Sequence, residues 1–141
     1  MPTKSASARY QGLGRDGRGQ VSTQSGVLKD NAYGFGTRFG DEAGTNPEEL
    51  LAAAHASCFT MALSFALAGA GYQAGTLDTD CKVTLEKDGE GFTITKSALT
   101  LRAQVEGIEE QEFARLAQEA KQSCPLSKLI NAEITLDYTL G

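Results

Sequence analysis

The chain has 141 residues, of which 40% are hydrophobic and 22% charged, and its formal net charge at pH 7 is −5. This length suits one globular domain with a single core, and the negative charge makes nucleic acid and anionic membranes unfavourable partners. Three cysteines without regular spacing and a single histidine argue against a disulfide scaffold and against a structural zinc site. The first residues lack the apolar core of a secretory signal, so we expect a cytoplasmic protein with reduced thiols.

The first 44 residues are predicted to form strands and a loop. Between Lys4 and Leu28, alternating residues flank the turn-forming stretch GLGRDGRG, which indicates a β-hairpin. A phosphate-binding loop is the alternative for these glycines, but neither an apolar strand nor a helix with Lys-Ser/Thr adjoins them. Residues 29–44 are expected to be a loop without its own regular structure, of a length typical of functional loops.

Residues 45–68 are predicted to form a long central helix. Asn46 is a suitable N-cap, Pro47 fits the first helical position, and Glu48 places negative charge at the positive end of the helix dipole. The rest of the helix is apolar on all sides, which predicts an interior position, and its charged residues and histidine argue against a membrane span. Cys58 lies within this helix, one turn after His55.

Residues 78–141 are predicted to form two strands, a helix and a final strand. The second strand, Phe92–Val105, changes the parity of its apolar residues, which indicates a bulge near Lys96 or Ser97. An amphipathic helix over 108–123 ends at Cys124, because Pro125 interrupts it, and a short helical turn follows. The whole order is typical of an α+β protein with mainly antiparallel strands.

Four motifs extend over much of the chain: YGFGTRF, TNPEELLAAAHASCFTMALS, AKQSCPLSK and the ending AEITLDY. They resemble the OsmC/Ohr family of bacterial thiol peroxidases, with the stronger similarity to the OsmC branch. The resemblance implies one OsmC-like domain over residues 1–141, with an antiparallel sheet packed on the central helix, in an intertwined homodimer. It also implies reduction of organic hydroperoxides in oxidative and osmotic stress defence, with a dithiol reductant (lipoyl-type or a small thiol) and without metal, haem or flavin.

The same resemblance assigns roles to individual residues. Cys58 corresponds to the peroxidatic cysteine and Cys124 to the resolving cysteine that forms a disulfide with it. Glu48 matches the glutamate after the TNP motif, and Arg38 matches the arginine of the OsmC branch. Arg15, in the GRDG turn, matches the arginine of the Ohr branch, and the surroundings of Arg38 favour Arg38 for this chain.

The residue types agree with this chemistry. An apolar site raises the pKa of a thiol, whereas a neighbouring guanidinium favours the thiolate that attacks peroxide. His55 could pair with Cys58, although a hydrogen-bonded core histidine is the favoured interpretation, and Cys81 is expected to be structural. Five residues are candidates for an apolar substrate pocket or, alternatively, for plain core: Phe35, Phe39, Phe59, Met61 and Leu129.

Two other functions are compatible with parts of the sequence. A Cys–His hydrolase needs an oxyanion hole, and a cysteine in the middle of a helix has no free backbone N–H to form one. A non-catalytic binder of apolar ligands would use the same pocket, and peroxide consumption in the presence of a dithiol would distinguish it from an enzyme.

Helix geometry adds an argument for the dimer. Glu48 and Cys58 are 10 residues apart (58 − 48), which corresponds to about 15 Å of helix. Two antiparallel copies crossing at Ala53 would bring Glu48 of one chain level with Cys58 of the other. The small side chains of Ala52–Ala54 would permit this close approach, and the two-fold contact would create two equivalent composite sites.

Overall fold

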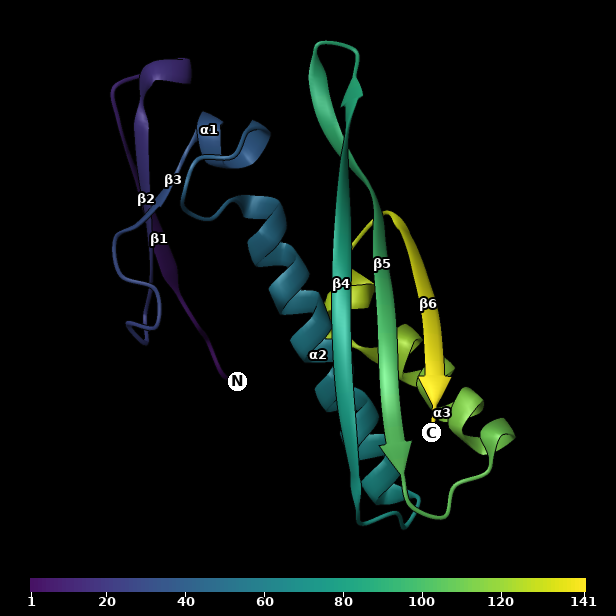
Figure 1. Ribbon diagram of the computed structural model, residues 1–141. Helices are drawn as coiled ribbons and strands as arrows, with labels where there is room; N and C mark the ends of the chain where they lie inside the picture. Colours follow the sequence, from purple (N-terminus) through teal and green to yellow (C-terminus); the bar gives the residue numbers. More distant parts are fainter. The chain divides into compact units, whose positions relative to one another are not determined.

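The computed structural model describes all 141 residues, which form two compact units, residues 1–50 and 51–141. The long helix α2 (Pro47–Gly69) continues across this boundary, with its first turn in the N-terminal unit and the remainder in the C-terminal unit. Figure 1 shows the order of the elements along the chain. The predicted central helix is therefore confirmed, with ends within two residues of those expected.

The N-terminal unit contains a three-stranded antiparallel sheet in the order β1-β2-β3. Strand β1 (Ala6–Gln11) and strand β2 (Arg18–Thr23) form the predicted hairpin, with a 3-10 turn, η1 (Gly14–Asp16), between them. The prediction of an irregular loop over residues 29–44 is wrong in part, because strand β3 (Asn31–Tyr33) and the one-turn helix α1 (Phe35–Phe39) lie there. Elements this short have no periodicity that a sequence pattern can show.

The C-terminal unit contains a second sheet, in the order β4-β5-β6. Strands β4 (Gly75–Asp88) and β5 (Gly91–Val105) are antiparallel, and their register shifts so that Thr95 is the extra residue, next to the predicted bulge position. Strand β6 (Glu133–Leu140) pairs in parallel with β5 (Figure 1), and the other three strand pairs are antiparallel, so the expectation of mainly antiparallel pairing is confirmed. The reason for the parallel pair is the connection: helices α3 (Glu110–Ser123) and α4 (Pro125–Leu129) carry the chain back along β5, so that Glu133 pairs with Lys96.

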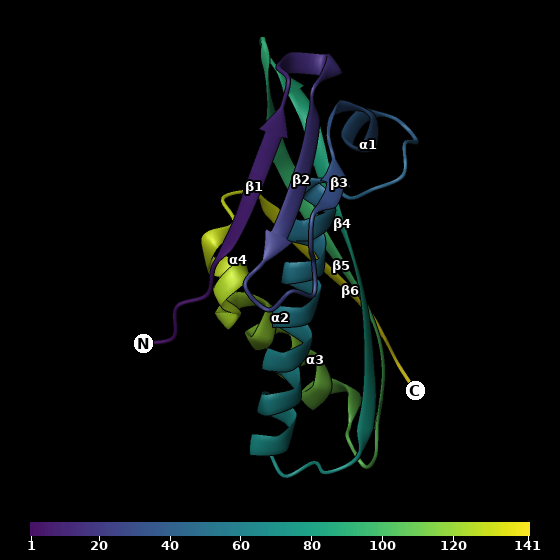
Figure 2. The same ribbon diagram turned by 90° about the vertical axis from the view of Figure 1, so that its left-hand side faces the viewer.

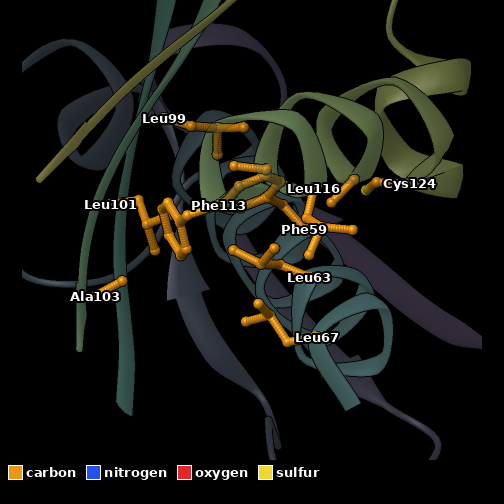
Figure 3. Close-up of a cluster of buried hydrophobic side chains, with 11 residues drawn as sticks. Phe59, Leu63, Leu67, Leu99, Leu101, Ala103, Phe113, Leu116 and Cys124 are labelled. Atoms are coloured by element: carbon orange, nitrogen blue, oxygen red, sulfur yellow. The ribbon is translucent and has the colours of Figure 1, made fainter. Parts of the chain in front are cut away.

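The core of this unit lies between one face of the sheet and two helices, α2 and α3, which cover the same side of it (Figure 2). Alternate residues of β5 face inward, and Figure 3 shows how they meet side chains from the helices. The buried apolar residues are Phe59, Leu63, Leu67, Leu99, Leu101, Ala103, Phe113, Leu116, Ala117, Ala120 and Cys124. Continuous packing of this kind provides most of the hydrophobic stabilisation of the fold.

Helix α2 is buried along one stripe only. His55, Phe59, Leu63 and Leu67 are covered, whereas a second stripe at the same four-residue spacing is exposed: Ala53, Ser57, Met61 and Phe65. We call this second set the exposed stripe; Met61 and Phe65 in it are 62% and 71% exposed. The expectation that the helix is interior on all sides is thus wrong for a single chain. By length and apolar composition alone α2 could also cross a membrane.

Candidate active site

Arg38 and Glu48 form a two-pronged ion pair within the N-terminal unit. The Nε atom of Arg38 donates to Oε1 of Glu48 at 2.7 Å, and its Nη2 atom donates to Oε2 at 3.0 Å. The Glu48 side chain is only 12% exposed, and its hydrogen bond raises the pKa of Arg38. This fork-to-fork geometry fixes the plane of the guanidinium as well as its charge.

Local backbone contacts explain why these two side chains meet. The Oγ1 atom of Thr37 accepts the Gly34 N–H at 2.8 Å, which closes the single turn of α1 that carries Arg38. Asn46 acts as the predicted N-cap, because its Oδ1 accepts the Glu49 N–H at 2.8 Å. The same side chain donates through Nδ2 to the Thr37 carbonyl at 3.0 Å, so it ties α1 to the start of α2.

The two candidate arginines have different environments. Arg38 has the glutamate partner, whereas Arg15 lies over the ring of Phe35, 4.3 Å from its centroid, and forms no ion pair. Both line a cavity of about 370 Å³ in the N-terminal unit, together with Tyr10, Gly14, Tyr33, Gly34, Phe35, Phe39 and Pro47. The aromatic walls agree with the predicted pocket positions of Phe35 and Phe39.

Cys58 and Cys124 are neighbours in the C-terminal unit. Cys58 is half-buried on α2, and Cys124 is fully buried at the junction of α3 and α4. Pro125 ends α3 directly after Cys124 and opens α4, as the sequence predicted. All three cysteines are free thiols in this structure.

The pKa of Cys58 reflects opposing influences. Burial raises it, as does the side-chain hydrogen bond with Cys124, while a hydrogen bond from the backbone N–H of Leu126 lowers it; the net direction is upward. A thiol in this environment needs a nearby positive charge before it becomes a good nucleophile near neutral pH. The Leu126 N–H was missed in the sequence reasoning, which considered only donors within the central helix.

His55 is the hydrogen-bonded core histidine that the sequence favoured. It is fully buried, its Nδ1 atom lies 2.6 Å from the Ser97 hydroxyl, and its Nε2 atom lies 2.8 Å from the Ser127 hydroxyl. Both ring nitrogens are therefore engaged by serines, and the ring does not pair with Cys58. Burial lowers the pKa of His55, so the ring is neutral at pH 7.

Cys81 joins the same group of polar side chains. Its sulfur lies 3.2 Å from the Ser97 hydroxyl, and burial raises its pKa. No sequence signal could have identified Ser97 and Ser127, because they lie 42 and 72 residues from His55. No group of three or more His, Cys, Asp or Glu side chains is arranged to hold a metal ion.

Of the two interpretations given for Phe59, pocket wall or plain core, the structure shows the core. Phe59 is fully buried in the core of the C-terminal unit, in the same cluster as Leu99 of β5 and Leu116 of α3 (Figure 3). Met61 and Leu129, by contrast, are largely exposed, at 62% and 74%. An aromatic residue on the inward stripe of α2 has the same periodicity whether it faces a core or a pocket, so the pattern did not distinguish the two.

An α+β fold in which two free thiols lie side by side is typical of thiol-based redox proteins. The family model for OsmC-like proteins matches residues 40–139. The chain is 50% identical to peroxiredoxin OsmC of Escherichia coli K12 over 137 residues, which cover 97% of this chain and 96% of that protein. The chain belongs to the OsmC family.

More distant relatives come from the Ohr branch. The organic hydroperoxide resistance protein of Xanthomonas axonopodis pv. citri is 33% identical over 130 residues, covering 91% of this chain and 88% of that protein. The crystal structure of the organic hydroperoxide resistance protein OhrB of Bacillus subtilis superposes with a TM-score of 0.70 at 27% identity, covering 99% and 98% of the two chains. The higher identity to OsmC confirms the assignment to the OsmC branch.

Proposed function

We propose that the protein is a two-cysteine peroxidase that reduces organic hydroperoxides to alcohols. Peroxidase activity in hydroperoxide defence is supported by the 50% identity to peroxiredoxin OsmC and by the organic hydroperoxide resistance proteins among its relatives. The single observation that carries the mechanism is the contact between the thiols of Cys58 and Cys124. Residues 1–141 are proposed to act as a single OsmC-like domain. The proposed location of the protein is the cytoplasm.

The proposed cycle begins with the thiolate of Cys58. It attacks the distal oxygen of the hydroperoxide, the O–O bond breaks, and the alkoxide leaves as an alcohol after taking a proton, which leaves a sulfenic acid on Cys58. The Cys124 thiol then displaces water from that sulfenic acid and forms the Cys58–Cys124 disulfide. A dithiol reduces the disulfide and is itself oxidised, so the free thiols return.

Arg38 supplies the positive charge in this proposal. Its guanidinium would stabilise the Cys58 thiolate and donate to the peroxide, and Glu48 would hold its plane. Arg15 would instead shape the aromatic wall of the pocket, since its partner is the ring of Phe35.

The two halves of the site are proposed to come from two chains. Ten residues of continuous helix separate Glu48 from Cys58, about 15 Å, whereas an antiparallel partner crossing at Ala53 would bring the two level. The exposed stripe runs from Ala53 to Phe65 and is apolar except for Ser57, which is explained if a second copy covers it. The homodimer would thus have two composite active sites.

Subunit mixing tests the composite site. Glu48→Ala and Cys58→Ser are each expected to be inactive as homodimers, and activity should partly return after subunit exchange, because one site in each heterodimer is complete. The control is a mixture of Cys58→Ser with Cys124→Ser, in which no thiol pair is intact. Absence of recovery despite confirmed exchange would contradict the two-chain arrangement.

A non-catalytic binder of apolar ligands is the competing function. An assay of organic hydroperoxide loss with a dithiol present separates the two, because a binder consumes no peroxide. Turnover by the parent protein that is absent in Cys58→Ser supports the peroxidase, and a parent protein with no turnover under several dithiols would refute it.

A further inference from the structure

Three elements of the C-terminal unit meet at the imidazole of His55. The ring belongs to α2, one of its nitrogens contacts Ser97 on β5, and the other contacts Ser127 on α4. A neutral imidazole donates from one nitrogen and accepts at the other, so both serines are satisfied at once. No buried side-chain polar atom of the chain lacks a partner.

The hydrogen bond between His55 and Ser127 of α4 lies close in sequence to both Cys58 and Cys124. Ser127 lies three residues after Cys124 and next to Leu126, whose backbone N–H donates to the Cys58 sulfur. The Lys128 N–H donates to the Cys124 carbonyl at 3.1 Å, so Cys124, Leu126 and Ser127 belong to one hydrogen-bonded turn. His55 itself lies one helical turn before Cys58 on α2. The bond between His55 and Ser127 therefore joins the segment with Cys124 to the helix with Cys58.

We propose that His55 is a positioning residue for the thiol reaction. Through Ser127 it holds the Cys124–Leu129 segment against α2, so that the Leu126 N–H points at the Cys58 sulfur and the Cys124 thiol stays beside it. Its bond to Ser97 anchors the ring in the core and plays no part in placing the thiols. An effect of His55 on peroxide turnover rests on the proposed two-cysteine cycle. The placement of the Leu126 N–H and the Cys124 thiol beside Cys58 can be tested in the reduced protein without turnover.

Two serine variants compare the two contacts of the imidazole, because each removes one hydroxyl and leaves one ring nitrogen unsatisfied. Ser97→Ala also removes the partner of the Cys81 thiol, so it disturbs the core at least as much as Ser127→Ala. The experiment measures the alkylation rate of Cys58 in the reduced protein between pH 6 and 10, with mass spectrometry to separate Cys58 from Cys81. Ser127→Ala should shift the Cys58 profile to higher pH and slow alkylation at pH 7 roughly ten- to a hundredfold, which corresponds to the loss of one hydrogen bond to a charged sulfur. Ser97→Ala should stay within about twofold of the parent protein.

A second measurement follows the next step of the cycle. After one equivalent of hydroperoxide, the over-oxidised fraction of Cys58 should increase several-fold in Ser127→Ala, because Cys124 reaches the sulfenic acid less often. If Ser127→Ala does not fold, Ser127→Thr and Ser127→Val replace it: the two side chains have the same shape, and only threonine keeps the hydroxyl.

The outcomes separate the alternatives. Equal shifts in Ser127→Ala and Ser97→Ala would mean that His55 has a general structural role, and no shift in either would also overturn the proposal. If the parent protein consumes no hydroperoxide, the proposed function fails, while the alkylation profiles still test the positioning role.

Discussion

The single histidine of the chain makes the pH dependence of stability unusually easy to assign. His55 is the only histidine, and burial lowers its pKa in the folded protein below the ordinary value of about 6.5. Between these two values the unfolded chain binds a proton that the folded chain excludes. The free energy of unfolding should therefore fall as the pH drops below about 6.5, and should not depend on this group at higher pH.

The size of the effect follows from one proton. Linkage limits the slope from one site to about 1.4 kcal/mol per pH unit, and the slope approaches that limit while the folded ring stays neutral. The structure explains why it stays neutral: a serine hydroxyl lies within 2.8 Å of each ring nitrogen and carries no charge to stabilise an imidazolium.

The assay is urea denaturation followed by circular dichroism between pH 5 and 7.5, at one protein concentration and with the thiols kept reduced. The His55→Gln variant serves as the control, since glutamine cannot titrate and the carboxylates contribute equally to both curves. The difference between parent and variant should be flat above pH 6.5 and decline below it. A difference that stays constant down to pH 5 would refute the assignment of a neutral, buried ring.

Three further predictions concern other parts of the chain. Arg38→Lys keeps the charge but not the two-pronged contact with Glu48, so the reaction of Cys58 with peroxide should slow about tenfold in stopped-flow measurements; an unchanged rate would show that charge alone matters. Gly44→Ala should lower the free energy of unfolding by about 1–3 kcal/mol in thermal denaturation, because Gly44 has φ 145° and a Cβ atom there would collide with the Ala32 carbonyl oxygen. Ala53→Leu should weaken the proposed dimer in sedimentation and lower activity with it, whereas in a monomer this exposed helical position would tolerate leucine.

Local signals in the sequence predicted the elements whose causes are local. The start of α2 was expected at Asn46, and the cap is formed by the Asn46 side chain and the Glu49 N–H. The parity change in β5 indicated a bulge near Lys96, and the extra residue is Thr95. The direction of β6 was not predicted, because alternation shows that a strand exists but not which way its neighbour runs.

The candidate site also contains residues that the sequence could predict and residues that it could not. Arg38, Glu48, Cys58 and Cys124 were named from family motifs, and the structure joins the first two as an ion pair and the last two as neighbouring thiols; their catalytic roles stay predictions. The supporting groups could not be predicted, since a serine 72 residues from His55 becomes its partner only through the packing of α4.

The unequal burial of the two thiols would restrict the reductants that can act in the proposed cycle. Cys124 is completely buried and Cys58 only half-buried, so an incoming thiol would attack the disulfide at the Cys58 sulfur and release the Cys124 thiol. The released thiol would stay beside the mixed disulfide at a high effective concentration, and it would expel a monothiol before a second molecule arrives. The second thiol of a dithiol is also held beside the mixed disulfide, so it would compete with the Cys124 thiol and release the reduced protein. In the proposed cycle, the buried position of Cys124 would thus favour a dithiol over a monothiol as the electron donor.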